Sequence, residues 1–430
     1  MNIVIKNLPD SQAELTIELT PEELKPHLEQ AAKQLANEVT IPGWRPGTAP
    51  YDVIKRQLGE MKIYEKSLNK VIDKTLWQAI KDKALESVGR PEVEIEKLAP
   101  GNNFVYRARV SLLPQIKLAD WSKIKIQRQS TLASVDEIDS VLKDIRKNLA
   151  SEVLVDRPAQ KDDKVVIDMD ISLDKVPIEG GQSKNHQIFL DENYYIPGLP
   201  EELLELKTGD EKSFTLPFPE GHYQKNLAGK NAEFKVMVKG VFERTLPELD
   251  DALAIKIGQT SLDSLKNLIK QNLETEKTQK EDRRVDLEII QALVKGSKFS
   301  ELPKVLIESE KHKMFAELKS GLEERGINFD DYLKNIKKTP EEITKDFEGG
   351  ATERVKAALL MRQIAKEKDI SNTPEELANE LAKIKEMYKD TPNIEDRLAQ
   401  PEIIDVVATN LTNRKVMEIL QQQMIGPIAG

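Results

Sequence analysis

The sequence predicts an α+β multidomain protein: an α+β N-terminal domain, an inserted β-rich domain and an elongated all-α C-terminal domain with arms. Three observations predict this fold class. The chain has 430 residues, enough for roughly three domains of about 150 residues. Its hydrophobic pattern changes to a period of two over 156–246 and then returns to a helical period. Charged residues make up 32% of the chain and aromatic residues 5%, so thin cores and helical arms fit better than one compact globule.

Residues 1–112 are predicted to form the α+β N-terminal domain. Polar and apolar residues alternate over 13–19, as a half-buried strand requires. A helix should begin directly afterwards, because Thr20 can cap it, Pro21 suits its first turn and Glu23 can close a capping box.

The rest of this domain predicts one long helix and one hairpin. Apolar residues recur at helical spacing over 51–88, so we expect a continuous helical stretch there. Two strand-like runs, 93–95 and 104–110, are separated by the turn residues 100–103. This arrangement is typical of a β-hairpin.

Residues 113–150 predict an extended connector and the first helix of a discontinuous helical domain. Ser134 and Glu137 form a second capping box at the start of that helix. Its apolar stripe has helical spacing and consists of Ile138, Val141, Leu142, Ile145 and Leu149. Residues 151–246 then show period-two runs between Gly- and Pro-containing turns, which predicts the inserted β-rich domain.

Residues 247–430 predict the helical domain and its arms. Thr339 and Thr373 each begin a Thr-Pro-Glu-Glu helix start. One helix is expected over 261–295, and its charged middle, 274–284, should stand partly in solvent. A further apolar stripe favours internal packing and consists of Leu306, Met314, Phe315, Leu318 and Leu322.

The sequence excludes several kinds of enzyme. There is no cysteine, which excludes disulfides, thiolate catalysis and Cys-ligated metals and fits a reducing compartment. No phosphate-binding Gly-rich loop followed by Lys and no G-x-S-x-G turn occurs. The histidines lie in separate segments, without metal-ligand spacing, and are expected to pack or face solvent: His27, His186, His222 and His312. We therefore expect no cofactor and no metal.

Charge and hydropathy limit the partners and the location. A net charge of −10 argues against DNA binding over the whole surface, although a local basic patch remains compatible with it. No run approaches the roughly 18 apolar residues of a membrane span. The N-terminus lacks the basic and then apolar pattern of a signal peptide. We expect a cytoplasmic protein without a membrane partner.

The loop at 41–50 is the most distinctive segment of the chain. It holds three prolines and two glycines, which favour a tight and well-defined connection between helices. Trp44 and Arg45 lie in its middle, and these two residue types are enriched at the energetic centres of interfaces. Two interpretations are open at this point: Trp44 folds back as a packed anchor, or it stands out as part of a docking tip.

This loop resembles the ribosome-docking signature of the trigger factor family, Gly-Phe-Arg-x-Gly-x-x-Pro. Gly43, Arg45, Gly47 and Pro50 match the signature, and Trp44 replaces its Phe. The segment 15–23, the inserted β-rich domain and the helical C-terminal half also follow the family's order over nearly the whole chain. The segment 300–310 is similar to a helix opening in the family's C-terminal domain.

The resemblance implies an ATP-independent chaperone that docks at the ribosomal exit tunnel and shields nascent polypeptides during folding. It implies four parts: a ribosome-binding domain (1–112), a connector with the first part of the helical domain (113–150), an isomerase-like domain (151–246) and a helical chaperone domain (247–430). The implied partners are the ribosome, through protein and RNA, and nascent or unfolded polypeptides. The resemblance also implies that the protein forms a weak homodimer away from the ribosome.

The loop departs from the family at two positions. Members often carry Lys where this chain has Pro46 and Thr48. Because ribosomal RNA is a polyanion, the loss of two cations should weaken the salt-dependent part of docking. Arg45 would then carry the electrostatic role, with Lys55 and Arg56 nearby.

The inserted domain resembles FK506-binding proteins, a class of peptidyl-prolyl cis-trans isomerases. Glu179-Gly180-Gly181, Ile196-Pro197-Gly198 and Phe218-Pro219-Glu220 follow the order of that class. The resemblance places the catalytic prolyl pocket at Met169, Ile178, Ile196, Leu199, His222 and Phe234. The class usually has aromatic residues at the first, second, fourth and fifth of these positions; here Phe234 keeps a ring and Tyr223 is displaced by one residue from His222.

These substitutions predict a degraded pocket with weak isomerase activity. Such enzymes hold a twisted X-Pro bond in a desolvated, largely aromatic site and lower a barrier of about 18–20 kcal/mol. Two alternatives remain open: the substitutions only repack an active pocket, or the chain acts primarily as a prolyl isomerase on folding intermediates. A periplasmic chaperone of similar helical build is disfavoured by the docking loop.

Overall fold

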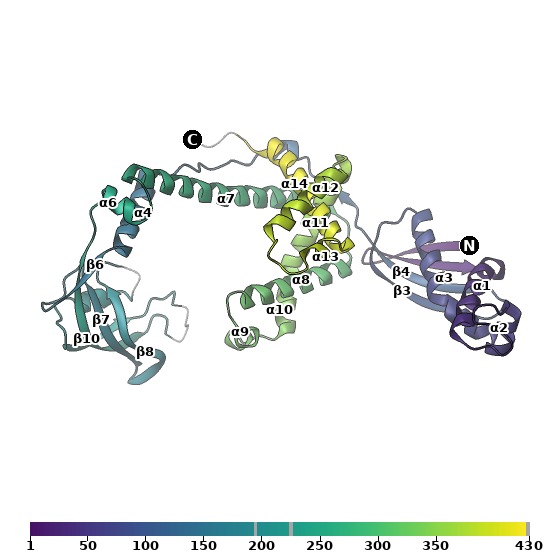
Figure 1. The fold of residues 1–430 in the computed structure, drawn as a ribbon, viewed down its shortest axis with the longest axis horizontal. Coiled ribbons are helices and arrows are strands. Elements are labelled where there is room, and N and C mark those ends of the chain that lie inside the picture. Colours follow the sequence, from purple (N-terminus) through teal and green to yellow (C-terminus); the bar gives the residue numbers. More distant parts are fainter. Residues whose placement is uncertain (193–195, 223–226, 427–430) are drawn as a thin grey trace. The chain divides into compact units, whose positions relative to one another are not determined.

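The computed structural model describes residues 1–192, 196–222 and 227–426. Two compact units divide the chain. One comprises residues 1–129 with 282–430, and the other comprises residues 130–281. Strands, a β-rich insertion and a helical C-terminal part are all present (Figure 1), which confirms the predicted α+β multidomain class.

The first unit begins with a four-stranded antiparallel sheet in the order β1-β2-β4-β3. Its strands are β1 (Asn2–Leu8), β2 (Gln12–Leu19), β3 (Ser87–Lys97) and β4 (Phe104–Leu112). The predicted alternation in β2 is confirmed, because every second residue is buried: Ala13, Leu15, Ile17 and Leu19. Three helices contribute to the same core: α1 (Pro21–Glu38), α2 (Tyr51–Leu58) and α3 (Glu60–Asp82).

The prediction of a continuous helix over 51–88 is wrong in two respects. The helix is interrupted at Gly59, whose φ of 83° lies outside the helical region and separates α2 from α3. It also stops at Asp82, because the chain turns and enters β3 at Ser87. The predicted hairpin is confirmed, since β3 pairs with β4 in an antiparallel register that includes Ile95 opposite Tyr106.

The helical part of the first unit begins with the end of α7 (Leu262–Gly296), from residue 282 onward. Its further helices are α8 (Lys304–Glu323), α9 (Phe329–Ile336), α10 (Pro340–Asp346), α11 (Glu348–Glu367), α12 (Pro374–Met387), α13 (Ile394–Leu398) and α14 (Pro401–Met424). The connector joins them through a short strand pair, β5 (Ile116–Lys117) with β11 (Lys298–Phe299), and through η1 (Trp121–Lys123). Trp121 donates a hydrogen bond from Nε1 to Gln423 at 2.8 Å, so the connector is tied to α14.

The second unit contains the inserted sheet, in the order β6-β10-β7-β8 with β9 paired to β10. Its strands are β6 (Ser151–Val155), β7 (Lys164–Leu173), β8 (Val176–Phe189), β9 (Glu211–Pro217) and β10 (Asn231–Thr245). The short helix α5 (Leu199–Leu203) packs on this sheet through buried Leu199 and Leu203. A separate small core joins α4 (Val135–Asn148) to α6 (Asp251–Lys256) and to the first turns of α7 (Leu262–Gly296).

Every predicted capping box is present. The side chains of Thr20, Ser134, Thr339 and Thr373 each accept from the backbone N–H three residues later, and a Glu reaches back to the cap. These motifs were predictable because all their partners lie within four residues of one another.

The charged middle of α7 is only partly in solvent. Glu276 and Lys280 are exposed, as predicted. Glu281, however, is buried, and the Lys277 ammonium pairs with Glu137 on α4 at 2.6 Å. The polar residues of this stretch therefore interact with neighbouring segments as well as with solvent. None of the helices in the described part of the chain is long and apolar enough to cross a membrane.

Candidate ribosome-docking loop, prolyl site and groove

The loop between α1 and α2 stands on two buried residues and exposes its middle. Ile41 and Ala49 are 4% and 7% exposed, whereas Trp44 is 43% exposed. Arg45 is also exposed, and no carboxylate of the described residues forms an ion pair with it. The structure therefore favours the interpretation in which Trp44 and Arg45 form a projecting tip.

Backbone hydrogen bonds fix the conformation of this loop. Gly47 donates its N–H to the carbonyl of Ala36 at 2.9 Å, which ties the loop to α1. The carbonyl of Arg45 accepts both from the N–H of Thr48 at 3.0 Å and from its hydroxyl at 2.7 Å. Thr48 thus stabilises the turn that presents Arg45, although it supplies no cation.

Gly47 is required where it stands. Its φ is 81°, a region that other residues enter at a cost of about 1–2 kcal/mol. A Cβ at this position would also overlap Oδ1 of Asn37. Pro50, the last matched residue of the loop, is the N-cap of α2 with a φ of −65° and so directs the chain into that helix.

The two cations expected near Arg45 differ in their availability. Lys55 pairs with Glu60 at 2.8 Å, and this hydrogen bond holds the pKa of Lys55 above its usual value. Arg56 is exposed on α2, and no described residue forms an ion pair with it. Arg45 and Arg56 are therefore the free cations of the loop and the helix that follows it.

The structure places five of the six predicted prolyl-pocket residues in one core, and the sixth, His222, contacts that core through Phe218. They are Met169 on β7, Ile178 on β8, Ile196 just before α5, Leu199 at the start of α5, His222 after β9 and Phe234 on β10. Leu199 and Phe234 are buried in this core, and the other apolar members are half-buried against it. The ring of His222 meets the ring of Phe218 edge-on, with centroids 4.9 Å apart. Tyr223 lies outside the described residues.

Two aromatic residues of this core were not assigned to the pocket from the sequence. The ring of Phe214 stacks on Phe234 with centroids 5.6 Å apart, and that of Phe218 lies 6.2 Å from Phe234. Phe218 and Phe234 are 6% and 0% exposed, so these rings mainly pack against one another. The Phe-Pro-Glu motif at Phe218 was the only feature of the sequence that pointed to either ring. The stacking itself could not be predicted, because it depends on the register between β9 and β10.

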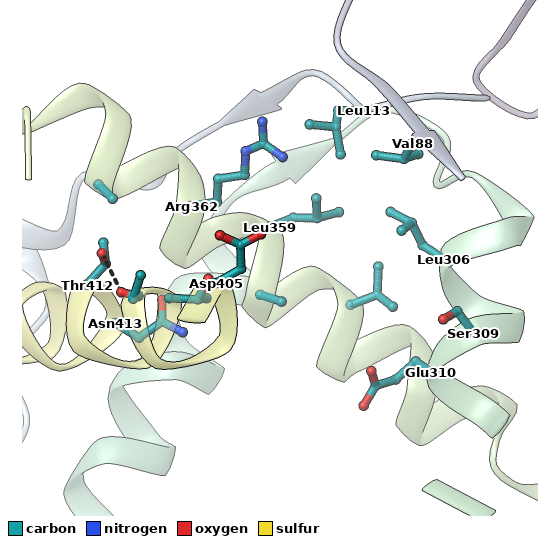
Figure 2. A pocket seen from close by; sticks show the side chains of 15 residues that line it. Val88, Leu113, Leu306, Ser309, Glu310, Leu359, Arg362, Asp405, Thr412 and Asn413 are labelled. Carbon is teal, nitrogen blue, oxygen red and sulfur yellow. Dashed lines mark hydrogen bonds between the residues drawn. The ribbon is translucent and has the colours of Figure 1, made fainter. Parts of the chain in front are cut away.

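A groove of about 720 Å³ lies among α8, α11 and α14 in the first unit (Figure 2). Its apolar wall includes Val88 at the start of β3, Leu113 after β4 and Leu306 on α8, which face one another in Figure 2. Arg362 and Asp405 provide polar groups on the opposite side. Such a mostly apolar hollow with a few polar groups suits a short unfolded peptide segment.

Leu306 was predicted to pack internally, and in the structure it is half-buried and lines the groove. Other members of its stripe do pack internally. Leu322 is buried, and Phe315 meets Phe329 of α9 edge-on at 5.3 Å between centroids. Along this one helix, some residues of the stripe therefore pack internally and Leu306 lines the groove.

Comparisons with known proteins agree over the whole chain. Family models described as "Bacterial trigger factor protein (TF)" and its C-terminus match residues 1–145 and 261–422, and an "FKBP-type peptidyl-prolyl cis-trans isomerase" model matches residues 155–239. Trigger factor of Caldicellulosiruptor bescii is 30% identical over 99% of this chain and 97% of its own. Trigger factor of Halalkalibacterium halodurans is 28% identical over 96% and 97%.

The fold is also similar to a solved structure. That structure belongs to a study of promiscuous substrate recognition in folding and assembly activities of the trigger factor chaperone. It covers 98% of this chain and 99% of its own, with a TM-score of 0.51 and 21% identity. At this identity the likeness concerns the fold alone.

Proposed function

Because the chain belongs to the trigger factor family and carries an FKBP-type peptidyl-prolyl isomerase domain, we propose that it is an ATP-independent chaperone. It docks at the ribosomal exit tunnel and shields nascent polypeptides. The observation that carries the docking proposal is the projecting tip, where an exposed Trp44 and an unpaired Arg45 stand on a hydrogen-bonded loop. This pair can contact both protein and RNA, since Trp offers contact area and Arg pairs with phosphate.

We propose the following division of labour. Residues 1–112 bind the ribosome through Gly43, Trp44, Arg45, Gly47 and Pro50, and residues 151–246 form the isomerase domain. Residues 113–150 and 247–430 form the helical chaperone domain, whose groove at Leu306 takes apolar client segments. The protein works in the cytoplasm, where it meets translating ribosomes, and it forms a weak homodimer away from them.

The docking proposal is tested by co-sedimentation of the full-length protein with purified ribosomes. Arg45→Ala should abolish co-sedimentation, because it removes the cation of the tip. Arg325→Ala is the matched control, since Arg325 is exposed and forms no ion pair within the described ranges. Unchanged co-sedimentation of the Arg45 variant, with the control also unchanged, contradicts the docking assignment.

We further propose that the isomerase activity is weak. The class normally encloses the X-Pro bond with aromatic side chains, whereas Met169, Ile178 and Leu199 are aliphatic here. Of the rings in this core, Phe218 and Phe234 are buried against each other.

A second candidate function is that of a prolyl isomerase whose helical domain presents substrates. It is favoured by the placement of five pocket positions in one core and by the contact of the sixth, His222, with Phe218 of that core. Deleting residues 151–246 distinguishes the two. The main proposal expects suppression of client aggregation to survive the deletion, whereas the alternative expects the protein's activity on folding intermediates to be lost.

A further inference from the structure

Helix α3 exposes a tryptophan that lies outside the docking loop. Trp77 is 71% exposed, and no aromatic ring among the described residues stacks on it. A Trp side chain can bury 150–250 Å² on contact. Leaving most of that area in water contributes nothing to the stability of the N-terminal domain, so the exposed ring is available to a partner.

Three lysines surround this ring on the same helix face. Lys70 and Lys74 lie seven and three residues before Trp77, and Lys81 lies four residues after it, positions that share one face of a helix. All three are exposed, and no described carboxylate forms an ion pair with any of them. We call Lys70, Lys74, Trp77 and Lys81 the α3 stripe.

The groups beside the stripe leave it positive. Asp73 is the acidic residue on the same face, and His27 on α1 lies close to Lys74. Burial, with a smaller effect of the Lys74 charge, lowers the pKa of His27, so this imidazole is neutral at pH 7. Three cations against one carboxylate make a local basic patch on a chain whose net charge is −10.

This arrangement does not stabilise α3 itself. Lys70 and Lys74 are four residues apart, and like charges at that spacing destabilise a helix by a few tenths of a kcal/mol. An exposed ring between unpaired cations is instead the chemistry that binds single-stranded nucleic acid. Bases stack on the ring, and the phosphates lie against the lysines.

The stripe lies on the helix that is tied to the segment leading into the docking loop. Lys66, one turn before Lys70 on α3, pairs with Glu38 at the end of α1 at 2.7 Å. The neighbouring carbonyl of Ala36 accepts the hydrogen bond from Gly47 in the loop. With a rise of about 1.5 Å per residue, Trp77 lies about 16 Å along the helix from Lys66. A partner held at the loop can therefore reach the stripe.

We propose that the α3 stripe binds an unpaired segment of ribosomal RNA, with a base stacked on Trp77 and phosphates on the three lysines. This inference rests on the proposed docking and adds a second contact to it. The cations that Pro46 and Thr48 remove from the loop are thereby supplied from a neighbouring helix. An apolar client segment would use the ring but would gain nothing from the lysines, so RNA is the favoured occupant.

Charge reversal tests the electrostatic part. The full-length triple variant Lys70→Glu, Lys74→Glu and Lys81→Glu is compared with the control Lys143→Glu, Lys161→Glu and Lys256→Glu, whose lysines are also exposed and enter no ion pair in the described ranges. Affinity for purified ribosomes is measured from about 50 to about 400 mM KCl. At about 0.7 per phosphate contact, the stripe variant should reduce the slope of log affinity against log salt by about two. Equal slopes for the two triple variants overturn the proposal.

The ring is tested separately. Trp77→Ala should weaken ribosome binding by about five-fold to about 150-fold, the range for loss of one stacked base, and Trp77→Phe should restore most of it. A benzophenone side chain at position 77, irradiated on the ribosome, should give a cross-link that ribonuclease digests. A cross-link to protein alone, or none, overturns the proposal. A cross-link to nascent chains alone assigns the stripe to clients and overturns it as well.

The variants of the loop and of the stripe separate two failures. If Arg45→Ala abolishes co-sedimentation while both triple variants behave like the wild type, docking stands and the stripe proposal is wrong. If Arg45→Ala has no effect but the stripe variant loses binding, the loop assignment is wrong and the RNA contact stands.

Discussion

Gly47 carries the conformation of the docking loop, and its environment gives a sharp prediction. Gly47→Ala places a methyl group at a φ of 81° and against Asn37, which would have to give up its hydrogen bond to the carbonyl of Lys33. The expected cost is about 2–3 kcal/mol, the sum of left-handed strain and one hydrogen bond. Hydrogen exchange of the α1 amides in the full-length protein measures it.

Gly43 supplies the matched control. Its φ of 82° is almost the same, but a Cβ there meets nothing within 4 Å. Gly43→Ala should therefore cost only the left-handed strain, about 1–2 kcal/mol. Equal costs for the two variants would show that the contact with Asn37 does not constrain the loop.

The exposure of Trp44 could not be decided from the sequence. Composition predicted a tight loop, because Pro and Gly act locally on the backbone. Whether a ring folds back depends on the surface beneath it, which α1 and α2 create only once they are packed. Trp77 shows the same limit, since helical spacing places it on a face but does not reveal that the face is uncovered.

Among the helices, the attachment of α4 to α7 should depend on pH. The hydrogen bond from Lys277, followed by those from Ser134, lowers the pKa of Glu137 to about 2 from an ordinary 4.5. A depressed pKa in the folded state gives stability that is present above the unfolded value and is lost as the pH falls through the folded one. Protection of the α4 amides should therefore fall between about pH 4.5 and about pH 2.

Hydrogen exchange on the full-length protein separates this effect from general acid unfolding. Glu137→Gln should remove the part of the pH dependence that belongs to this window. Asp139→Asn on the same helix is the control, because Asp139 is exposed and forms no ion pair with the described residues. Identical pH profiles for the wild type and the Glu137 variant would contradict the assignment.

The inserted β-rich domain should be a weak prolyl isomerase. In a protease-coupled assay with a proline-containing peptide, the wild-type protein should accelerate isomerisation only weakly, because aliphatic side chains replace most of the pocket aromatics. A robust rate insensitive to FK506 would instead show that the substitutions repack an active site.

Elements were predictable where their determinants are local. The four capping boxes, the β3–β4 hairpin and the alternation in β2 follow from residues a few positions apart, and the structure confirms them. The break at Gly59 was missed because the apolar periodicity continues across it. The Phe214–Phe234 stack was missed because it depends on the pairing of two strands.

For the whole molecule, the sequence predicted the order of its parts but not the surfaces that they form together. The groove joins Val88, Leu306 and Asp405, which come from three segments distant in the chain. No local pattern brings such residues together; only the packing of α8, α11 and α14 does. The resemblance to a family supplied the function, and the structure supplied the exposed tip, the groove and the α3 stripe.

The most direct test of the central claim is the binding of the wild-type protein and of Arg45→Ala to purified ribosomes across a salt series. The wild type should co-sediment at low salt and be released progressively as salt rises, because salt weakens the contacts between its cations and the phosphates of ribosomal RNA. Arg45→Ala should fail to co-sediment at every salt concentration. Co-sedimentation of Arg45→Ala at wild-type levels, or no binding of the wild type at low salt, would contradict the account.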